Sequence, residues 1–98
     1  MEIRFIHPSE LELDEAIEYY NYQLPGLGTE FYKEVNKTIE RITRFPEAWA
    51  KLGHYTRRCL IKKFPYSILY SIDDNGDILI LAIANMHRNP VYYKDRIH

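Results

Sequence analysis

The residues best suited to chemistry are basic and aromatic side chains, and they gather in two parts of the sequence. One group surrounds an expected strand, and the other follows the last apolar run, where polarity switches abruptly. Catalytic groups often lie where a buried strand gives way to a loop. The first group is Arg57, Arg58, Lys62 and Lys63, and the second is His87, Arg88, Tyr92 and Tyr93.

These residue types match what metal-independent cleavage of RNA requires. A base must take the 2′-OH proton, a cation must stabilise the charged phosphorane, and an acid must protonate the leaving oxygen. A histidine titrates near neutral pH, an arginine holds phosphate oxygens with two donors, and a tyrosine can stack on a base or assist the acid. The catalytic candidates are therefore His87, Arg88, Tyr93 and Arg58, and the substrate-binding candidates are Arg57, Lys62, Lys63 and Tyr92.

Plain structural roles are the alternative for several of these side chains. Tyrosines on a sheet face usually pack, and we expect this of Tyr66 and Tyr70 on the neighbouring strand. His87 and Arg88 could serve only to cap the end of a strand and to pair with Asp95 or with an acidic helix. The sequence leaves both interpretations open.

The charge of the chain is small in total but unevenly distributed. The formal net charge is −1, yet residues 1–47 carry five basic and ten acidic side chains, and residues 48–72 carry five basic and no acidic ones. A basic block can attract an anionic partner whatever the net charge. Alternation along a strand places Arg57, Cys59, Ile61 and Lys63 on one face and Arg58, Leu60 and Lys62 on the other. Only one of these two sets can face the open side of the sheet, unless a bulge intervenes.

Other kinds of chemistry find little support. None of the four histidines has a second ligand at a metal-binding spacing, and the single cysteine, Cys59, can form neither an internal disulfide nor a structural zinc site. We interpret Cys59 as a small buried hydrophobe. The four glycines lie in connectors and a hairpin rather than in a phosphate-binding loop. We expect no metal and no cofactor.

Length and composition predict one soluble domain. Ninety-eight residues, 46% hydrophobic and 28% charged, suit a single domain spanning residues 1–98. The N-terminus lacks the pattern of a signal peptide, and no apolar stretch reaches the length of a membrane span. We therefore expect a cytoplasmic protein with no membrane partner.

Two helices are expected in the first half of the chain. Ser9 and Glu12 have capping-box spacing, so a helix should begin at Ser9 or Glu10. After the connector 25–28, a second helix should run from about Thr29 to Phe45, ended by Pro46. The predicted apolar stripes are Leu13, Ala16, Ile17, Tyr20 and Leu24 in the first helix, and Phe31, Val35, Ile39 and Ile42 in the second. The side chains predicted to face water on the second helix are Lys33, Glu34, Lys37, Glu40, Arg41 and Arg44.

The remaining elements are expected to be strands and a tail. Residues 2–7 and, less clearly, 55–62 form strands, and residues 64–72 alternate strictly. Asn75 and Gly76 predict a type I′ hairpin turn. Residues 78–84 are apolar throughout, as in a strand covered on both faces. The tail should hold a loop and a short helical turn.

The order β-α-α-β-β-β predicts an α+β fold, with a helical hairpin packed on one face of a small, mostly antiparallel sheet. The last three strands form a meander. The first strand joins an edge of the sheet or lies beside the last strand. An exposed edge strand leaves room for a homodimer by strand pairing.

Four segments in this order resemble the RelE/ParE toxin superfamily across nearly the whole chain. The first is the helical hairpin, ELDEAIEYY followed by LPGLGTEFYKEV, and the second is RFPEAW after it. The third is RRCLIKKFPYSILYSI, the paired strands. The fourth is ILILAIANMHRNPVYYKDR, the last strand and the tail. The His-Arg-x-Pro-x-Tyr tail is typical of members known as plasmid stabilisation proteins.

The resemblance implies the toxin of a type II toxin–antitoxin system, paired with a small antitoxin that wraps the toxin and blocks its site. RelE-like members cut messenger RNA on the ribosome with basic sheet residues and with Arg and Tyr near the C-terminus, and the candidates above occupy comparable regions. On this interpretation the chain is a ribosome-dependent endoribonuclease. ParE-like members instead inhibit DNA gyrase and need no nuclease site. A third possibility is a non-toxic relative that only binds its antitoxin.

Overall fold

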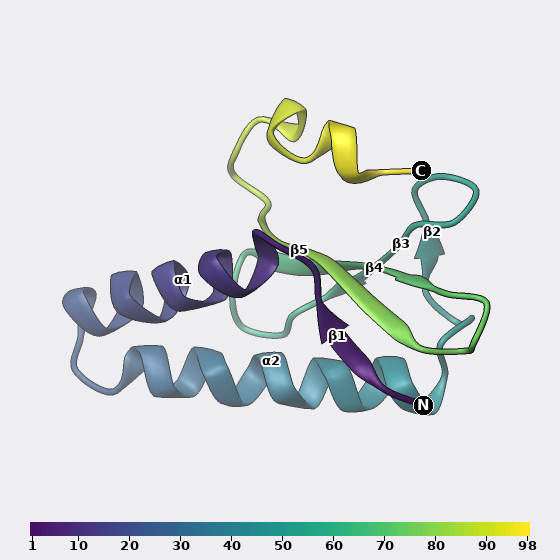
Figure 1. Ribbon diagram of the computed structural model, residues 1–98. Helices are drawn as coiled ribbons and strands as arrows, with labels where there is room; N and C mark the ends of the chain where they lie inside the picture. Colours follow the sequence, from purple (N-terminus) through teal and green to yellow (C-terminus); the bar gives the residue numbers. More distant parts are fainter.

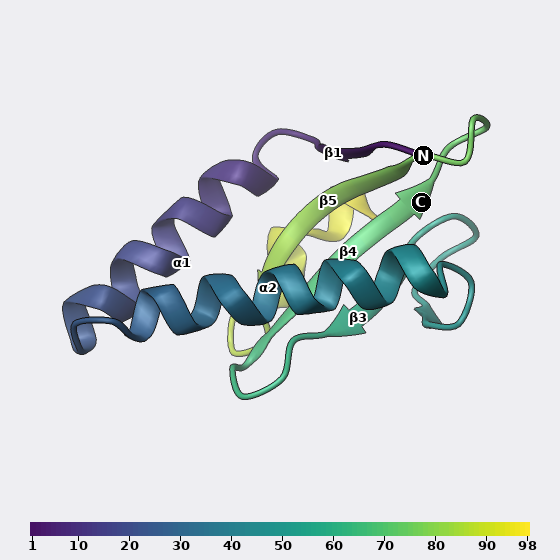
Figure 2. The ribbon, with the colours of Figure 1, turned by 90° about the horizontal axis from the view of Figure 1, so that it is seen from below.

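The two helices form an antiparallel hairpin in the computed structural model, which describes residues 1–98. α1 (Ser9–Gln23) and α2 (Leu27–Arg44) lie side by side, and α2 crosses one face of the sheet (Figures 1 and 2). Phe31, Val35 and Ile42 of α2 are fully buried against that face, as their spacing predicted. No helix of the chain is both long enough and apolar enough to cross a membrane.

α1 begins at Ser9 as predicted, but the predicted capping box is wrong. Pro8 is the N-cap residue, and Ser9 lies inside the helix with its hydroxyl donating to the Ile80 carbonyl at 3.0 Å. Glu12 turns toward β5 instead of back to the N-cap. Leu24 was also predicted wrongly, because it follows the end of α1 and is exposed.

α2 begins at Leu27, two residues earlier than predicted, and the connector is correspondingly shorter. Gly28 therefore lies in its first turn, where its N–H donates to the Asn21 side chain at 2.8 Å. A Cβ at this position would lie 2.3 Å from the Ile17 carbonyl oxygen. Glycine is thus what allows the two helices to approach so closely.

Glu34 on α2 corrects another prediction, since it does not face water. The residue is 3% exposed. Its carboxylate lies 3.6 Å from the Lys37 ammonium and 3.5 Å from that of Lys63. Lys63 comes from the turn between β3 and β4 and has a positive φ of 72°. The buried acid therefore ties that turn to α2.

The sheet has five strands in the order β1-β5-β4-β3-β2. The strands are β1 (Ile3–Phe5), β2 (Ala50–Lys51), β3 (Arg57–Leu60), β4 (Tyr66–Ile72) and β5 (Ile78–Asn85). β1 is an edge strand and pairs in parallel with β5, and the other pairings are antiparallel. The predicted α+β fold is confirmed. β2 was not predicted, because two residues carry no recognisable period.

The hairpin between β4 and β5 does not have the predicted type I′ turn. Of its residues only Gly76 has a positive φ, 83°, whereas Asn75 does not. The Gly76 N–H donates to the Asp73 carbonyl at 3.0 Å, and the Asp73 carboxylate accepts the N–H groups of Asn75 and Asp77. The aspartate therefore stabilises a different turn, in which one glycine supplies the left-handed residue.

Both faces of the sheet centre are buried, as the continuous apolar run of β5 predicted. A register shift between Leu69 and Tyr70 of β4 leaves Leu81 as an extra residue on β5. This bulge reverses the alternation. Ile78, Ile80 and Ile83 consequently face the helices. The opposite face is covered by the tail, whose short 3-10 turns η1 (Pro90–Tyr92) and η2 (Lys94–Arg96) lie on the far side of the sheet from α2 (Figures 1 and 2).

Candidate functional site

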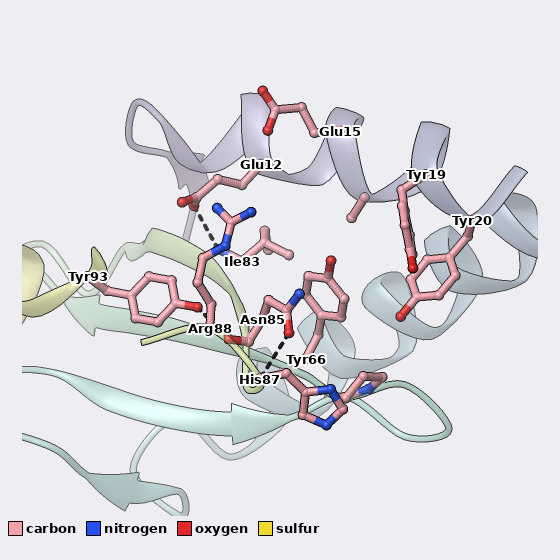
Figure 3. A pocket seen from close by; sticks show the side chains of 12 residues that line it. Glu12, Glu15, Tyr19, Tyr20, Tyr66, Ile83, Asn85, His87, Arg88 and Tyr93 are labelled. Carbon is pink, nitrogen blue, oxygen red and sulfur yellow. Dashed lines mark hydrogen bonds between the residues drawn. The ribbon is translucent and has the colours of Figure 1, made fainter. Parts of the chain in front are cut away.

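A cleft of about 340 Å³ opens between α1 and the end of β5. Seven of its twelve lining residues are aromatic or aliphatic, and the other five are polar or charged. Figure 3 shows side chains from α1, β4, β5 and the tail around this space. The lining residues are Glu12, Glu15, Ala16, Tyr19, Tyr20, Pro65, Tyr66, Ile83, Asn85, His87, Arg88 and Tyr93.

Hydrogen bonds among three residues fix the side of the cleft that β5 and the tail form. The Tyr93 hydroxyl donates to the Asn85 carbonyl at 2.5 Å, and the Asn85 side chain accepts the backbone N–H of His87 at 2.9 Å. Burial raises the pKa of the Tyr93 hydroxyl, although the Arg88 charge acts against this. Burial likewise raises the pKa of the Tyr66 hydroxyl, and the Arg88 charge again acts against this. Both phenols are therefore protonated at neutral pH, and each can donate one hydrogen bond, which Tyr93 gives to the Asn85 carbonyl.

The side of the cleft that α1 forms is fixed by an ion pair between α1 and the tail. Arg96 donates to both carboxylate oxygens of Glu12, at 2.9 and 2.8 Å, and also to the Leu81 carbonyl at 3.1 Å. One of these oxygens also accepts the Ile83 N–H at 3.1 Å. Hydrogen bonding to Glu12 raises the pKa of Arg96. One carboxylate thus joins α1, the open edge of β5 and the tail.

The second group of sequence candidates meets at this cleft. His87, Arg88 and Tyr93 all line it. Tyr92 does not line the cleft, but its ring lies under the Arg88 guanidinium. The Arg88 Cζ is 4.4 Å from the centroid of the Tyr92 ring. Arg88 is therefore held by cation–π stacking and does not pair with Asp95, the alternative that the sequence left open.

The first group lies elsewhere, and two of its four residues have structural partners. Arg57 faces the helices and donates to the Glu47 and Trp49 carbonyls, each at 2.9 Å. Lys63 pairs with Glu34. Arg58 is exposed on the face that the tail shares, opposite Leu69 of β4.

The spacing of strands and residues puts Arg58 far from the cleft. β3 is two strands from β5 in the sheet order. Across the sheet Arg58 lies level with Leu69 of β4 and Ala82 of β5, and Ala82 is three residues from Asn85 along β5. Those steps correspond to a backbone separation of about 14 Å. Lys62 is exposed in the turn after β3 and does not line the cleft either.

Sequence reasoning missed the contribution of α1. Glu12, Glu15, Ala16 and Tyr19 all line the cleft, and they form one row at helical spacing. The two acids lie outside the apolar stripe that was predicted for this helix. A row of acidic and aromatic residues beside an apolar stripe was the available signal. Nothing in the sequence connects Glu12 with Arg96, which lies 84 residues away.

The cleft offers protonated phenols, one amide, an exposed imidazole and charges of both signs. No three histidine, cysteine, aspartate or glutamate side chains come together in a way that could hold a metal ion. No serine or cysteine lines the cleft, so a nucleophile–base pair is absent there.

Comparison with known proteins identifies the family. The model for the ParE toxin of the type II toxin–antitoxin system parDE matches residues 3–90. The solved structure described as the chromosomal ParDE TA system from P. aeruginosa superposes with a TM-score of 0.76, at 14% identity, over 89% of this chain and 97% of that one. The isolated E. coli RelE toxin gives a TM-score of 0.66, at 15% identity, over 97% of this chain and 94% of that one. No curated protein matches the sequence.

Identities this low show a shared fold and nothing about the target of the toxin. The family match rests instead on the sequence and covers most of the chain, from β1 to the start of the tail. It confirms the resemblance to the RelE/ParE superfamily, and it implies an antitoxin as a partner. This chain belongs to the ParE family of type II toxin–antitoxin toxins.

Proposed function

We propose that this chain is a toxin that acts by binding DNA gyrase, and that it does not cleave RNA. One observation carries the proposal: of the cations expected in a nuclease site, only Arg88 lines the cleft. Arg57 and Lys63 have structural partners. The backbone of Arg58 lies about 14 Å from that of Asn85 at the cleft. Membership of the ParE family supports gyrase as the target.

The groups inside the cleft are also poorly arranged for phosphodiester cleavage. The hydroxyl of Tyr93, the candidate acid, already donates to a backbone carbonyl. Two carboxylates, those of Glu12 and Glu15, line the same space. Glu12 is neutralised by its ion pair, but Glu15 has no cationic partner within 4.0 Å and would repel an approaching phosphate.

The surroundings of the cleft suit contact with a protein. Tyr19, Tyr92 and Met86 are about half exposed at or near its rim, and Arg88 is exposed and stacks on Tyr92. Tyrosine, methionine and arginine are enriched in protein interfaces, and tyrosine and arginine often contribute most of the binding energy. A toxin that binds through this surface is neutralised if its antitoxin covers it, so we expect the antitoxin to occupy the same cleft.

A supercoiling assay with purified gyrase tests the proposal. The wild-type protein should inhibit supercoiling, and Arg88→Ala should raise the concentration needed by about tenfold or more, because interface arginines often contribute that much. Arg58→Ala is the matched control, since it removes an exposed arginine outside the cleft. It should leave inhibition unchanged.

RNA from cells that express the toxin provides the opposing measurement. Primer extension should find transcripts intact, whereas in-frame cleavage that is lost with Arg58→Ala or His87→Ala would establish the nuclease instead. A protein that neither inhibits gyrase nor cuts RNA would also refute the proposal, and it would favour a relative that only binds its antitoxin.

A further inference from the structure

One edge of the sheet is open along a whole strand. β1 has a strand on one side only, because it is the last in the sheet order. The Ile78 N–H donates to the Glu2 carbonyl, and the Ile6 N–H donates to the Ile80 carbonyl. The backbone N–H and C=O groups of the even-numbered residues in and beside β1 therefore point toward β5. In a parallel pairing the residues between them direct both backbone groups the other way, so the N–H and C=O of Ile3 and Phe5 point outward.

This edge is only partly protected against pairing. Edge strands are commonly protected by short length, charged side chains, proline or a bulge, and β1 is short and carries Arg4 but contains no proline, no lysine and no bulge. The apolar side chains of Met1, Ile3 and Ile6 are 72%, 38% and 41% exposed along it. The opposite edge of the sheet differs, since β2 has only two residues and its partner β3 carries two adjacent arginines.

The charges of β1 make the edge complementary to itself. If two copies pair antiparallel with Ile3 opposite Ile3, then Glu2 of each copy lies opposite Arg4 of the other. Residues directly opposite each other share a face, and pairs between the hydrogen-bonded ones approach most closely. Glu2 has no cationic partner within 4.0 Å in the chain, whereas Arg4 pairs with Asp73 through only one of its nitrogens.

We propose that two copies of this chain associate through their β1 edges, in antiparallel register centred on Ile3, to form one continuous ten-stranded sheet from two sheets of five strands. The backbone groups of Ile3 form two reciprocal hydrogen bonds at the symmetry axis, and a Glu2–Arg4 pair lies on either side. The three-residue strand gives a small contact. The dimer is therefore weak and forms in the micromolar to millimolar range.

A second copy suits this edge better than the opposite edge, which is formed by β2. β2 has only two residues and already pairs with Arg57 and Arg58 of β3, so a copy docked there would bring Lys51 and these arginines near their own counterparts. Like charges that face each other destabilise a strand pair. The same rule favours β1, where each charge meets its opposite. The two-fold axis also makes the contact closed, so association stops at a dimer.

Sedimentation velocity of the untagged protein over a range of concentrations tests the dimer, and charge exchange tests its register. Glu2→Arg alone, or Arg4→Glu alone, places like charges opposite each other twice. Each should raise the dimer dissociation constant by about tenfold. An equimolar mixture of the two variants restores opposite charges at both positions. The mixture should therefore form a heterodimer about as well as the wild type forms a homodimer.

Ile3→Pro is a second variant that does not depend on charge. It removes the outward N–H and leaves the bonds to β5 in place, and proline is tolerated in an edge strand whose N–H faces solvent. It should weaken the dimer while the melting temperature of the monomer stays close to that of wild type. A protein that stays monomeric at every concentration would overturn the proposal. A dimer that neither the charge variants nor Ile3→Pro weaken would overturn it as well.

Discussion

Removal of the Glu12 carboxylate should destabilise the protein far more than removal of any other acid on α1. The carboxylate accepts three hydrogen bonds, two from Arg96 and one from the Ile83 N–H. Its side chain is 15% exposed and that of Arg96 is 20% exposed. Glu12→Ala leaves a half-buried guanidinium with only the Leu81 carbonyl as partner, and it leaves a strand N–H with none.

The expected cost follows from those lost contacts. An unsatisfied buried donor costs about 1–3 kcal/mol, and an exposed ion pair contributes about 0–1 kcal/mol. Because this pair is intermediate in exposure, Glu12→Ala should lower the free energy of unfolding by about 2–3 kcal/mol. In a domain of this size that corresponds to a fall in melting temperature of roughly 10–20 °C. Glu12→Gln keeps an acceptor for Ile83 and should cost less.

Urea unfolding followed by circular dichroism measures these differences. Glu10→Ala is the matched control, since Glu10 lies on the same helix, is exposed, and pairs only with His7. Its cost should be about 0.5 kcal/mol or less. The reasoning fails if Glu12→Ala costs no more than Glu10→Ala. A double-mutant cycle with Arg96→Met should also give a coupling energy, and additive single effects would refute the pairing.

Three further substitutions test the packing of the fold. Gly28→Ala should lower the melting temperature despite its better helix propensity, because its Cβ would lie 2.3 Å from the backbone oxygen of Ile17. Ser9→Ala should cost about 1 kcal/mol in urea unfolding through the lost bond to Ile80. Burial raises the pKa of Tyr70 from 10.0 to about 12. Its contribution to stability is therefore full below pH 10.0 and is lost as pH rises through about 12, at about 1.4 kcal/mol per unit. Tyr70→Phe should make stability less dependent on pH in that window.

The elements that could be predicted from sequence are those whose period is set by burial. α2, β4 and β5 repeat their apolar residues at helical or strand spacing, and each was found close to its predicted position. Details controlled by single polar groups were predicted wrongly. Ser9 had a capping alternative within its own helix, and its hydroxyl bonds instead to a strand 71 residues away. Local spacing carries no information about a partner at that separation.

The candidate site divides in the same way. His87, Arg88 and Tyr93 line one cleft because they follow directly on a strand that the sequence marks clearly, so their proximity is a property of one segment. The intrachain contacts of Arg57 and Lys63 were not expected, because a basic side chain near a strand has the same sequence signature whether it binds a ligand or an acceptor of its own chain. Their actual acceptors, the Trp49 carbonyl and the Glu34 carboxylate, depend on how α2 and β3 approach each other.

The same long-range contacts explain how an exposed loop can present a fixed surface. His87 and Arg88 lie in a short connection whose two ends are held, since Asn85 belongs to β5 and Tyr93 bonds back to the Asn85 carbonyl. The tail beyond Tyr93 is held in turn by Arg96, which Glu12 anchors to α1. Loss of the Glu12–Arg96 ion pair should therefore release the tail and loosen the loop that holds His87 and Arg88. This effect does not require either charge to contact a bound protein. Glu12→Gln should consequently weaken any activity that depends on Arg88, at temperatures where the protein is still folded.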